Sequence, residues 1–271
     1  MKLRQWWQSM GDYLDIRSTV TPLAASQQLL DDWFHCRQGQ FLLQREKQAL
    51  EQLMPQPGAH RMLYLGPASC RLLSGDYNHL HSFCFSASSR APGSASAIAD
   101  FDALPLPSET VDTVLLHHAL EFSEYPHEVL SEVSRVLTPC GQAIIVVLNP
   151  ASLFGFTKWP MRLCSEQPVW RHHSLRYRRL LDWLRLLNLQ PERAVSGCFS
   201  WPFSYSNGES PGLFEKAGQR VRLPWGAFYI VLARKYTARL TPLRPRLWRS
   251  ISAPLVSGIE KTAHRCKEKD R

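Results

Sequence analysis

The chain lacks a long apolar run. Its longest uninterrupted apolar segments, residues 143–148 and 227–233, fall far short of the roughly 20 residues that a membrane-spanning helix needs. The start of the chain carries Trp6, Trp7 and scattered charges in place of an apolar segment with a small-residue cleavage site. We therefore expect no membrane span and no secretion signal, and a cytoplasmic location follows as an expectation.

Paired cysteines are also missing. The seven cysteines are scattered, none forms a Cys-x-x-Cys pair, and their odd number argues against a disulfide framework. The same spacing gives no support to a cysteine-based zinc site, so we predict no metal site.

Most of the chain has little net charge. Of the formal net charge of +9, a share of +8 belongs to residues 234–271, which contain eleven Lys or Arg and three acidic residues. This basic segment has three prolines and no sustained periodicity. Two interpretations remain open for it. It is either an arm that contacts nucleic-acid phosphates or an anionic membrane surface, or a solubilising disordered extension.

The 271 residues, 44% of them hydrophobic, suffice for one large domain with extensions. Apolar periodicity predicts a helical region from Leu29 to Leu53, with Gly39 as the expected point of a break. Further helices are expected from Pro126, ending at the turn 138–141, and over 174–187. The segments that resemble strands are 61–65, 79–85, 111–116, 142–148, 193–199 and 227–233.

Alternation of strands and helices predicts an α/β fold with a doubly wound, mostly parallel sheet. Such sheets bind ligands at the carboxyl ends of their strands. A site is therefore expected in the residues that follow Leu65, Phe85, Ala99, Leu116 and Leu148.

Segment 100–150 carries the most specific pattern. An acidic residue precedes a Leu-Pro turn, an Asp-containing strand follows, and a helix ends in Glu-x-x-Arg-Val-Leu before a Pro-x-Gly turn and a central strand. These features correspond to Asp100, 104–106, 111–112, 132–137 and 139–141. The segment resembles the second half of the class I S-adenosylmethionine-dependent methyltransferase domain. With its flanks, the resemblance covers roughly residues 30–235 and implies a seven-stranded, Rossmann-like sheet. The runs 149–155 and 182–189 are similar to a small bacterial group of type 11 methyltransferase-like proteins.

The first half of the expected cofactor site departs from the family. Members have Gly-x-Gly-x-Gly after the first strand, whereas this chain reads Gly66, Pro67, Ala68, Ser69, and Pro67 has no N–H to donate. The acid that accepts the ribose hydroxyls after the second strand is replaced at Ser86. We therefore expect weak cofactor binding.

The resemblance implies a cofactor site for S-adenosylmethionine made of Leu65, Gly66, Pro67, Ser86, Asp100, Phe101 and His117. Asp100 either hydrogen-bonds the adenine amino group or starts a turn. Phe101 packs either on the adenine ring or in the core.

Two residues are candidates for a catalytic role. His118, like His117, follows the fourth strand, where it serves either as a general base or as a structural residue. Asn149 follows the central strand and either orients an acceptor or caps the next segment.

The sequence thus favours transfer of a methyl group from S-adenosylmethionine to an unknown acceptor by a domain spanning residues 26–235. Residues 1–25 are an N-terminal extension, and 236–271 a basic tail that is expected to be disordered. The alternative is a non-catalytic methyltransferase-like binding or scaffolding protein that contacts RNA through this tail. Fold alone does not decide between the two.

Overall fold

The computed structural model describes residues 23–53, 61–67, 81–87, 96–152, 155–158, 170, 172–199 and 226–236. The chain divides into two compact units, 1–237 and 238–271, and all described residues belong to the first. The predicted N-terminal extension up to residue 22 and the basic tail beyond residue 236 lie outside the described residues. No helix in the described segments is long and apolar enough to cross a bilayer.

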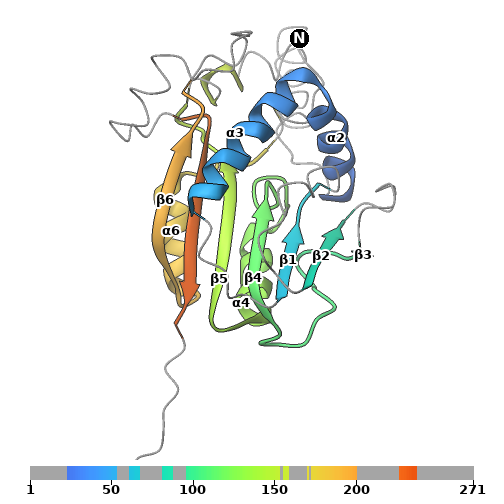
Figure 1. Ribbon diagram of the computed structural model, residues 1–271, viewed down its shortest axis with the longest axis vertical. Helices are drawn as coiled ribbons and strands as arrows, with labels where there is room; N and C mark the ends of the chain where they lie inside the picture. The colour runs from blue at the N-terminus through green and yellow to red at the C-terminus, as the bar shows by residue number, and fades with distance from the viewer. Residues whose placement is uncertain are drawn as a thin grey trace, which may run out of the picture. The chain divides into compact units, whose positions relative to one another are not determined.

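The described residues form both helices and strands (Figure 1). The helices are α2 (Leu23–His35), α3 (Arg37–Leu53), α4 (Pro126–Val136) and α6 (Tyr177–Leu186). The strands are β1 (Arg61–Leu65), β2 (His81–Ser86), β3 (Ala97–Ile98), β4 (Val111–His117), β5 (Leu137–Leu148), β6 (Leu189–Gly197) and β7 (Phe228–Lys235).

The strands form one seven-stranded sheet in the order β3-β2-β1-β4-β5-β7-β6. Strands β1 to β5 are parallel to one another, whereas β7 runs antiparallel to both β5 and β6. The doubly wound, mostly parallel sheet expected from the sequence is confirmed. Its carboxyl edge brings together the residues that follow β1, β2 and β4.

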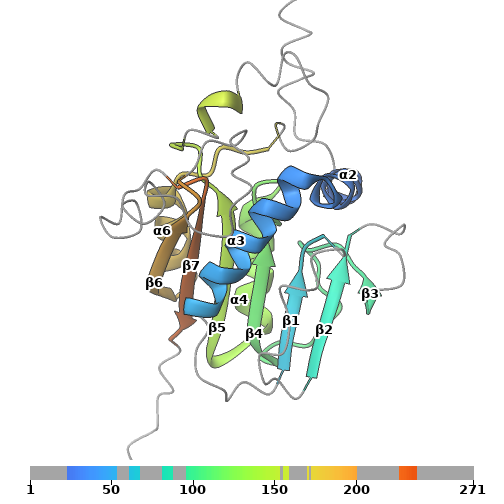
Figure 2. The same cartoon turned by 45° about the horizontal axis from the view of Figure 1, so that its top comes forward.

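Helices cover both faces of the sheet. Helix α3 crosses one face diagonally, and α4 and α6 lie on the other (Figures 1 and 2). Side chains alternate along the strands, so Leu115 and Ile144 join the core under α2 and α3, while Leu116 and Ile145 join the core under α4 and α6. Burial on both faces explains why these strands are continuously apolar.

The break in the N-terminal helical region falls at Cys36, and the expected break at Gly39 is wrong. Gly39 lies inside α3, where an added Cβ would come within 2.3 Å of the Trp33 carbonyl oxygen and 2.6 Å of Phe34 Cα. Glycine is therefore required there by the close approach of α3 to the end of α2, and it does not end the helix.

The expected turn at 138–141 is part of strand β5, which begins at Leu137 directly after α4. Within it, Cys140 has φ 68°, a left-handed conformation that favours glycine. Cys140 stands where the resemblance places the first glycine of a Pro-Gly-Gly turn, and its backbone has a conformation that glycine adopts readily.

Candidate functional site

A buried carboxylate on α3 contacts the two histidines at the end of β4. Glu46 Oε2 lies 2.9 Å from His117 Nε2, and Glu46 Oε1 lies 3.0 Å from His118 Nε2. All three side chains are buried. Helix α3 crosses one face of the sheet (Figure 2). The contact therefore joins this helix to the carboxyl end of β4.

Each histidine also has a partner for its second ring nitrogen. His118 Nδ1 lies 2.6 Å from Glu121 Oε1, and His117 Nδ1 lies 3.1 Å from the Tyr64 hydroxyl. The rings of both histidines pack against Phe34. Both imidazoles are therefore fixed in orientation at both nitrogens.

The two histidines have opposite electrostatic environments. Burial lowers the pKa of His118, but the carboxylates of Glu46 and Glu121 outweigh it and raise that pKa above its usual value. Burial lowers the pKa of His117, and the charge on His118 lowers it further. His117 is accordingly the neutral ring, and its Nε2–H donates to Glu46.

The same charges act on Glu46. Burial raises the pKa of its carboxyl group, but the charge on His118 and the hydrogen bonds from both histidines reverse this effect, so its pKa is lowered. Glu121 accepts a further hydrogen bond at Oε1 from Leu148 N, at 3.0 Å, while its Oε2 is buried and has no hydrogen-bond partner among the described residues.

A second side chain from the N-terminal helices reaches the end of β2. Gln27 of α2 accepts hydrogen bonds at Oε1 from Ala87 N at 2.7 Å and from Ser86 Oγ at 3.2 Å. Because a backbone N–H can only donate, this contact fixes which end of the amide is oxygen. The other end, Gln27 Nε2, is buried without a hydrogen-bond partner in the described structure.

The residues after β1 contact one another closely. Leu65 is a core residue. A Cβ at Gly66 would lie 2.7 Å from the His117 carbonyl oxygen and 3.0 Å from the Tyr64 hydroxyl. The Pro67 carbonyl oxygen lies 3.1 Å from the same hydroxyl. Packing within the protein explains the surviving glycine, so its presence alone does not indicate a cofactor.

Asp100 and Phe101 follow β3 and lie in different environments. Asp100 is exposed, and its backbone carbonyl accepts a hydrogen bond from Ala103 N. Phe101 is 1% exposed and belongs to the core beneath α4 and α6. Of the alternatives left open for Phe101, the structure shows core packing, whereas the Asp100 carboxylate faces solvent and is accessible to a ligand.

Asn149 caps the segment after β5. Its Oδ1 accepts from Ala151 N at 3.1 Å, and its Nδ2 donates to the Gly226 carbonyl at 2.9 Å. The capping interpretation is the one that these contacts support, and a direct role in catalysis stays a prediction.

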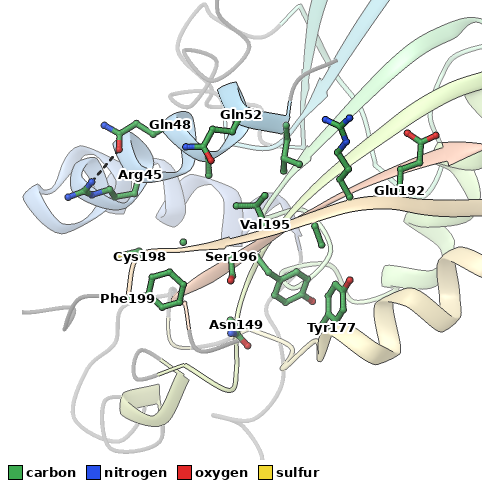
Figure 3. Close-up of a pocket in the computed structure, with 16 residues that line it drawn as sticks. Arg45, Gln48, Gln52, Asn149, Tyr177, Glu192, Val195, Ser196, Cys198 and Phe199 are labelled. Atoms are coloured by element: carbon green, nitrogen blue, oxygen red, sulfur yellow. Dashed lines mark hydrogen bonds between the residues drawn. The ribbon is translucent and has the colours of Figure 1, made fainter. Parts of the chain in front are cut away.

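A pocket of about 700 Å³ lies beside β6, which is an edge strand of the sheet. Figure 3 shows Gln48 and Gln52 of α3 on one side of this strand, and Asn149 and Tyr177 on the other. The pocket does not include the histidines or Gln27. Asn149 is the only predicted site residue among those that line it.

The sequence predictions missed Gln27 and Glu46. Each is a polar residue in the apolar stripe of an amphipathic helix: Gln27 stands between Leu23 and Leu30, and Glu46 between Leu42 and Ala49. A polar side chain at such a position needs a buried partner. This interruption of the stripe was the available signal, although it does not identify the partner.

Comparison with known proteins agrees with the fold. The sequence profile of the methyltransferase domain family matches residues 69–145. This part of the chain is therefore similar to the methyltransferase domain family. The uncharacterized protein YafS of Escherichia coli is 31% identical over 157 residues, which are 55% of this chain and 62% of the relative. The chain thus matches less than two thirds of that relative's length.

Solved structures show the same architecture. A methyltransferase of Thermotoga maritima, described as a possible histamine N-methyltransferase, superposes with a TM-score of 0.61 at 18% identity, covering 78% of this chain and 99% of that chain. A methyltransferase of Archaeoglobus fulgidus gives a TM-score of 0.51 at 16% identity, covering 70% and 93%. At these identities the likeness concerns the fold.

Proposed function

We propose that this domain binds S-adenosylmethionine at the carboxyl edge of β1, β2 and β4 and transfers the methyl group to a nucleophilic acceptor. The observation that carries the proposal is the buried Nε2 of Gln27 at the end of β2, which has no hydrogen-bond partner among the described residues. A buried donor without an acceptor costs free energy, and a ligand oxygen at this place would remove that cost.

The residues present fit the nucleoside half of the cofactor. In the dinucleotide-binding sheets that share this architecture, an acid after β2 takes the ribose hydroxyls. Here Ser86 stands at that place, and Gln27 of α2 supplies instead a donor that has no partner in the described part of the chain. The exposed carboxylate of Asp100 is available for the adenine amino group.

The methionine half fits less well. Gly66 leaves no space beside the His117 carbonyl oxygen, and Pro67 offers no N–H. Most of the affinity should therefore come from the nucleoside. Adenosine should bind nearly as well as the whole S-adenosylhomocysteine molecule, which is unusual for a site that selects a complete cofactor.

The reaction places modest demands on the protein. When bound, the cofactor supplies a methyl group already activated by the sulfonium, so the chain has to hold the donor and the nucleophile in line and exclude water. No side chain has to act as a base. The closed hydrogen bonding of His118 is compatible with such a mechanism, because neither of its ring nitrogens needs to reach the acceptor.

We further propose that the acceptor binds in the pocket beside β6. The pocket extends to Asn149, the first residue after β5, and therefore reaches the carboxyl edge of the sheet. Its lining mixes charged, amide and aromatic side chains, as small-molecule sites often do. Ala194 lines the pocket from an exposed position, so Ala194→Trp should fill it without disturbing the core.

A second function has its own support. The direct contacts among Tyr64, Gly66, Pro67 and His117 fill the place after β1. A chain in which the space after β1 is closed can bind a nucleoside at the carboxyl edge of the sheet without transferring a methyl group. The second proposal is a nucleoside-binding or scaffolding protein without methyl transfer.

The deciding experiment combines calorimetry with a transfer assay. S-adenosylmethionine, S-adenosylhomocysteine and adenosine are titrated into the protein, and methyl-labelled cofactor is incubated with fractionated cell extract. Binding of all three ligands with transfer that Ala194→Trp abolishes supports the enzyme and its acceptor pocket. Binding without transfer to any fraction supports the second function. No heat and no thermal shift at millimolar ligand would contradict both.

A further inference from the structure

The contacts of Glu46, His117 and His118 resemble those of a metal centre more than those of an ordinary buried ion pair. Both histidines direct Nε2 at the carboxylate, one at each oxygen, at 2.9 and 3.0 Å. The nitrogen atoms and a carboxylate oxygen all lie within 4.8 Å of one another. Two imidazoles and one carboxylate form a common ligand set for transition metals.

The surroundings hold the two rings as a second coordination layer does. Metal-binding histidines nearly always have their other nitrogen held by a carboxylate, a carbonyl or a polar group, which orients the ring. His118 Nδ1 has the Glu121 carboxylate at 2.6 Å, and His117 Nδ1 has the Tyr64 hydroxyl at 3.1 Å. Both Nε2 atoms thereby face the Glu46 carboxylate, one at each oxygen.

The buried charges give an independent reason to expect a metal ion at this place. Glu46 and Glu121 bring two carboxylates into a place from which solvent is excluded, and both are 0% exposed. Even with one imidazole protonated, as His118 is here, one of the two negative charges stays without compensation, at a high cost in a low-dielectric interior. One divalent cation that displaces this proton would balance both carboxylates.

We propose that Glu46, His117 and His118 bind one divalent transition-metal ion, for which Zn²⁺ is the probe. This site goes beyond the proposed methyl transfer and does not rest on it. With Glu46 bidentate, the two Nε2 atoms and the two carboxylate oxygens provide four donor atoms. Because the centre is closed to solvent, the ion holds α3 against the end of β4 and does not contact the acceptor.

The geometry needs only small movements to accept the ion. Zn–N bonds of about 2.1 Å at a tetrahedral angle place the two nitrogens about 3.4 Å apart. The present separation is within 4.8 Å, so rotation of the two rings closes the difference. Neither Glu46 nor β4 has to move as a whole.

The test uses the full chain without a histidine tag. The protein is stripped with a chelator, its fold is checked by circular dichroism, and Zn²⁺ or Co²⁺ is added. We expect one ion per chain by elemental analysis and a melting temperature higher by at least about 5 °C. Co²⁺ should give visible bands without the near-ultraviolet charge transfer of thiolate ligands.

Variants locate the site. Glu46→Gln and His118→Gln should each weaken binding by at least about 100-fold, and Glu121→Gln by about 10–100-fold, as expected for an outer residue. His81→Gln is the matched control, since His81 is exposed at the start of β2, and it should bind like the parent protein.

Three results would overturn the inference. The first is a folded, chelator-treated parent protein that takes up no ion and whose melting temperature does not change with Zn²⁺. The second is a Co²⁺ spectrum with thiolate charge transfer, and the third is undiminished metal binding by folded Glu46→Gln and His118→Gln. If these variants do not fold, the stoichiometry, the spectrum and the melting shift of the parent protein decide the question.

Discussion

Gln27 accepts the backbone N–H of Ala87 at 2.7 Å, and this bond places an amide from α2 at the end of strand β2. The two residues are 60 positions apart in the chain. In related sheets the end of the second strand holds the ribose of a nucleotide through its own acid. Here the polar group comes from a different element, and its spare donor faces no protein acceptor among the described residues.

Gln27→Met should weaken binding of S-adenosylhomocysteine about tenfold. Methionine keeps the length and apolar contacts of the side chain but removes the donor, and one hydrogen bond in a buried site is worth about 1.4 kcal/mol. Calorimetry checks this result. Gln44→Met is the control, because Gln44 is exposed on α3. Equal affinity of the two variants would show that Gln27 only supports the loop after β2.

Asp100→Ala should weaken cofactor binding by about 1–3 kcal/mol, the usual effect of removing a partner of a ligand's polar group. The melting temperature without ligand should change little, since the Asp100 carboxylate is exposed. The affinity reports on ligand recognition, and the melting temperature of the ligand-free protein reports on structure. A large loss of stability with unchanged affinity would make Asp100 a turn residue.

Gly66→Ala should destabilise the protein without any ligand by about 1–3 kcal/mol. The added methyl would meet the His117 carbonyl oxygen at 2.7 Å, and backbone atoms of a central strand cannot move away cheaply. Urea denaturation measures the change. An unchanged stability combined with lost cofactor binding would instead give Gly66 the role that it has in the family's glycine motif.

Much of the fold could be predicted from periodicity, because each strand buries neighbouring side chains on both faces and reads as a continuous apolar run. The site could be predicted only where its residues lie at the ends of strands, as Ser86 and His117 do. Gln27 and Glu46 could not be paired with their partners in this way. Their contacts span 60 and 71 positions, and they depend on how α2 and α3 cross the sheet.

The break at Cys36 shows the same limit. Glycine is a poor helix former, so propensity places the break at Gly39. The packing of α3 against Trp33 and Phe34 requires a residue without a side chain there and keeps it helical. These tertiary contacts outweigh the unfavourable helix propensity of glycine, which amounts to about 1 kcal/mol.

Glu132→Gln should lower stability at neutral pH by about 1 kcal/mol. Glu132 accepts hydrogen bonds from Arg135 and from Leu104 N, at 2.8 and 3.0 Å. The Arg135 hydrogen bond lowers the pKa of Glu132, so this stabilisation is present above the pKa of the unfolded chain and is lost as pH falls through the lower pKa of the folded state. Thermal melts of both proteins should therefore converge in acid. A constant difference down to pH 2 would contradict the assignment.

Deletion of residues 236–271 should leave the fold intact, because β7 ends at Lys235 and already pairs with both β5 and β6. The cut removes nine Lys or Arg and three acidic residues and lowers the formal net charge from +9 to +3. If the removed segment is an arm for nucleic acid, its clustered cations release counterions from the phosphates on binding. The full chain should then bind RNA or DNA with an affinity that falls steeply as salt is raised, and the truncated chain should lose this binding but keep its affinity for S-adenosylhomocysteine. Fluorescence anisotropy at several salt concentrations measures the first property, and calorimetry the second. Equal nucleic-acid binding by both proteins would refute the arm and favour a solubilising extension, whereas failure of the truncated chain to fold would show that the segment packs on the domain.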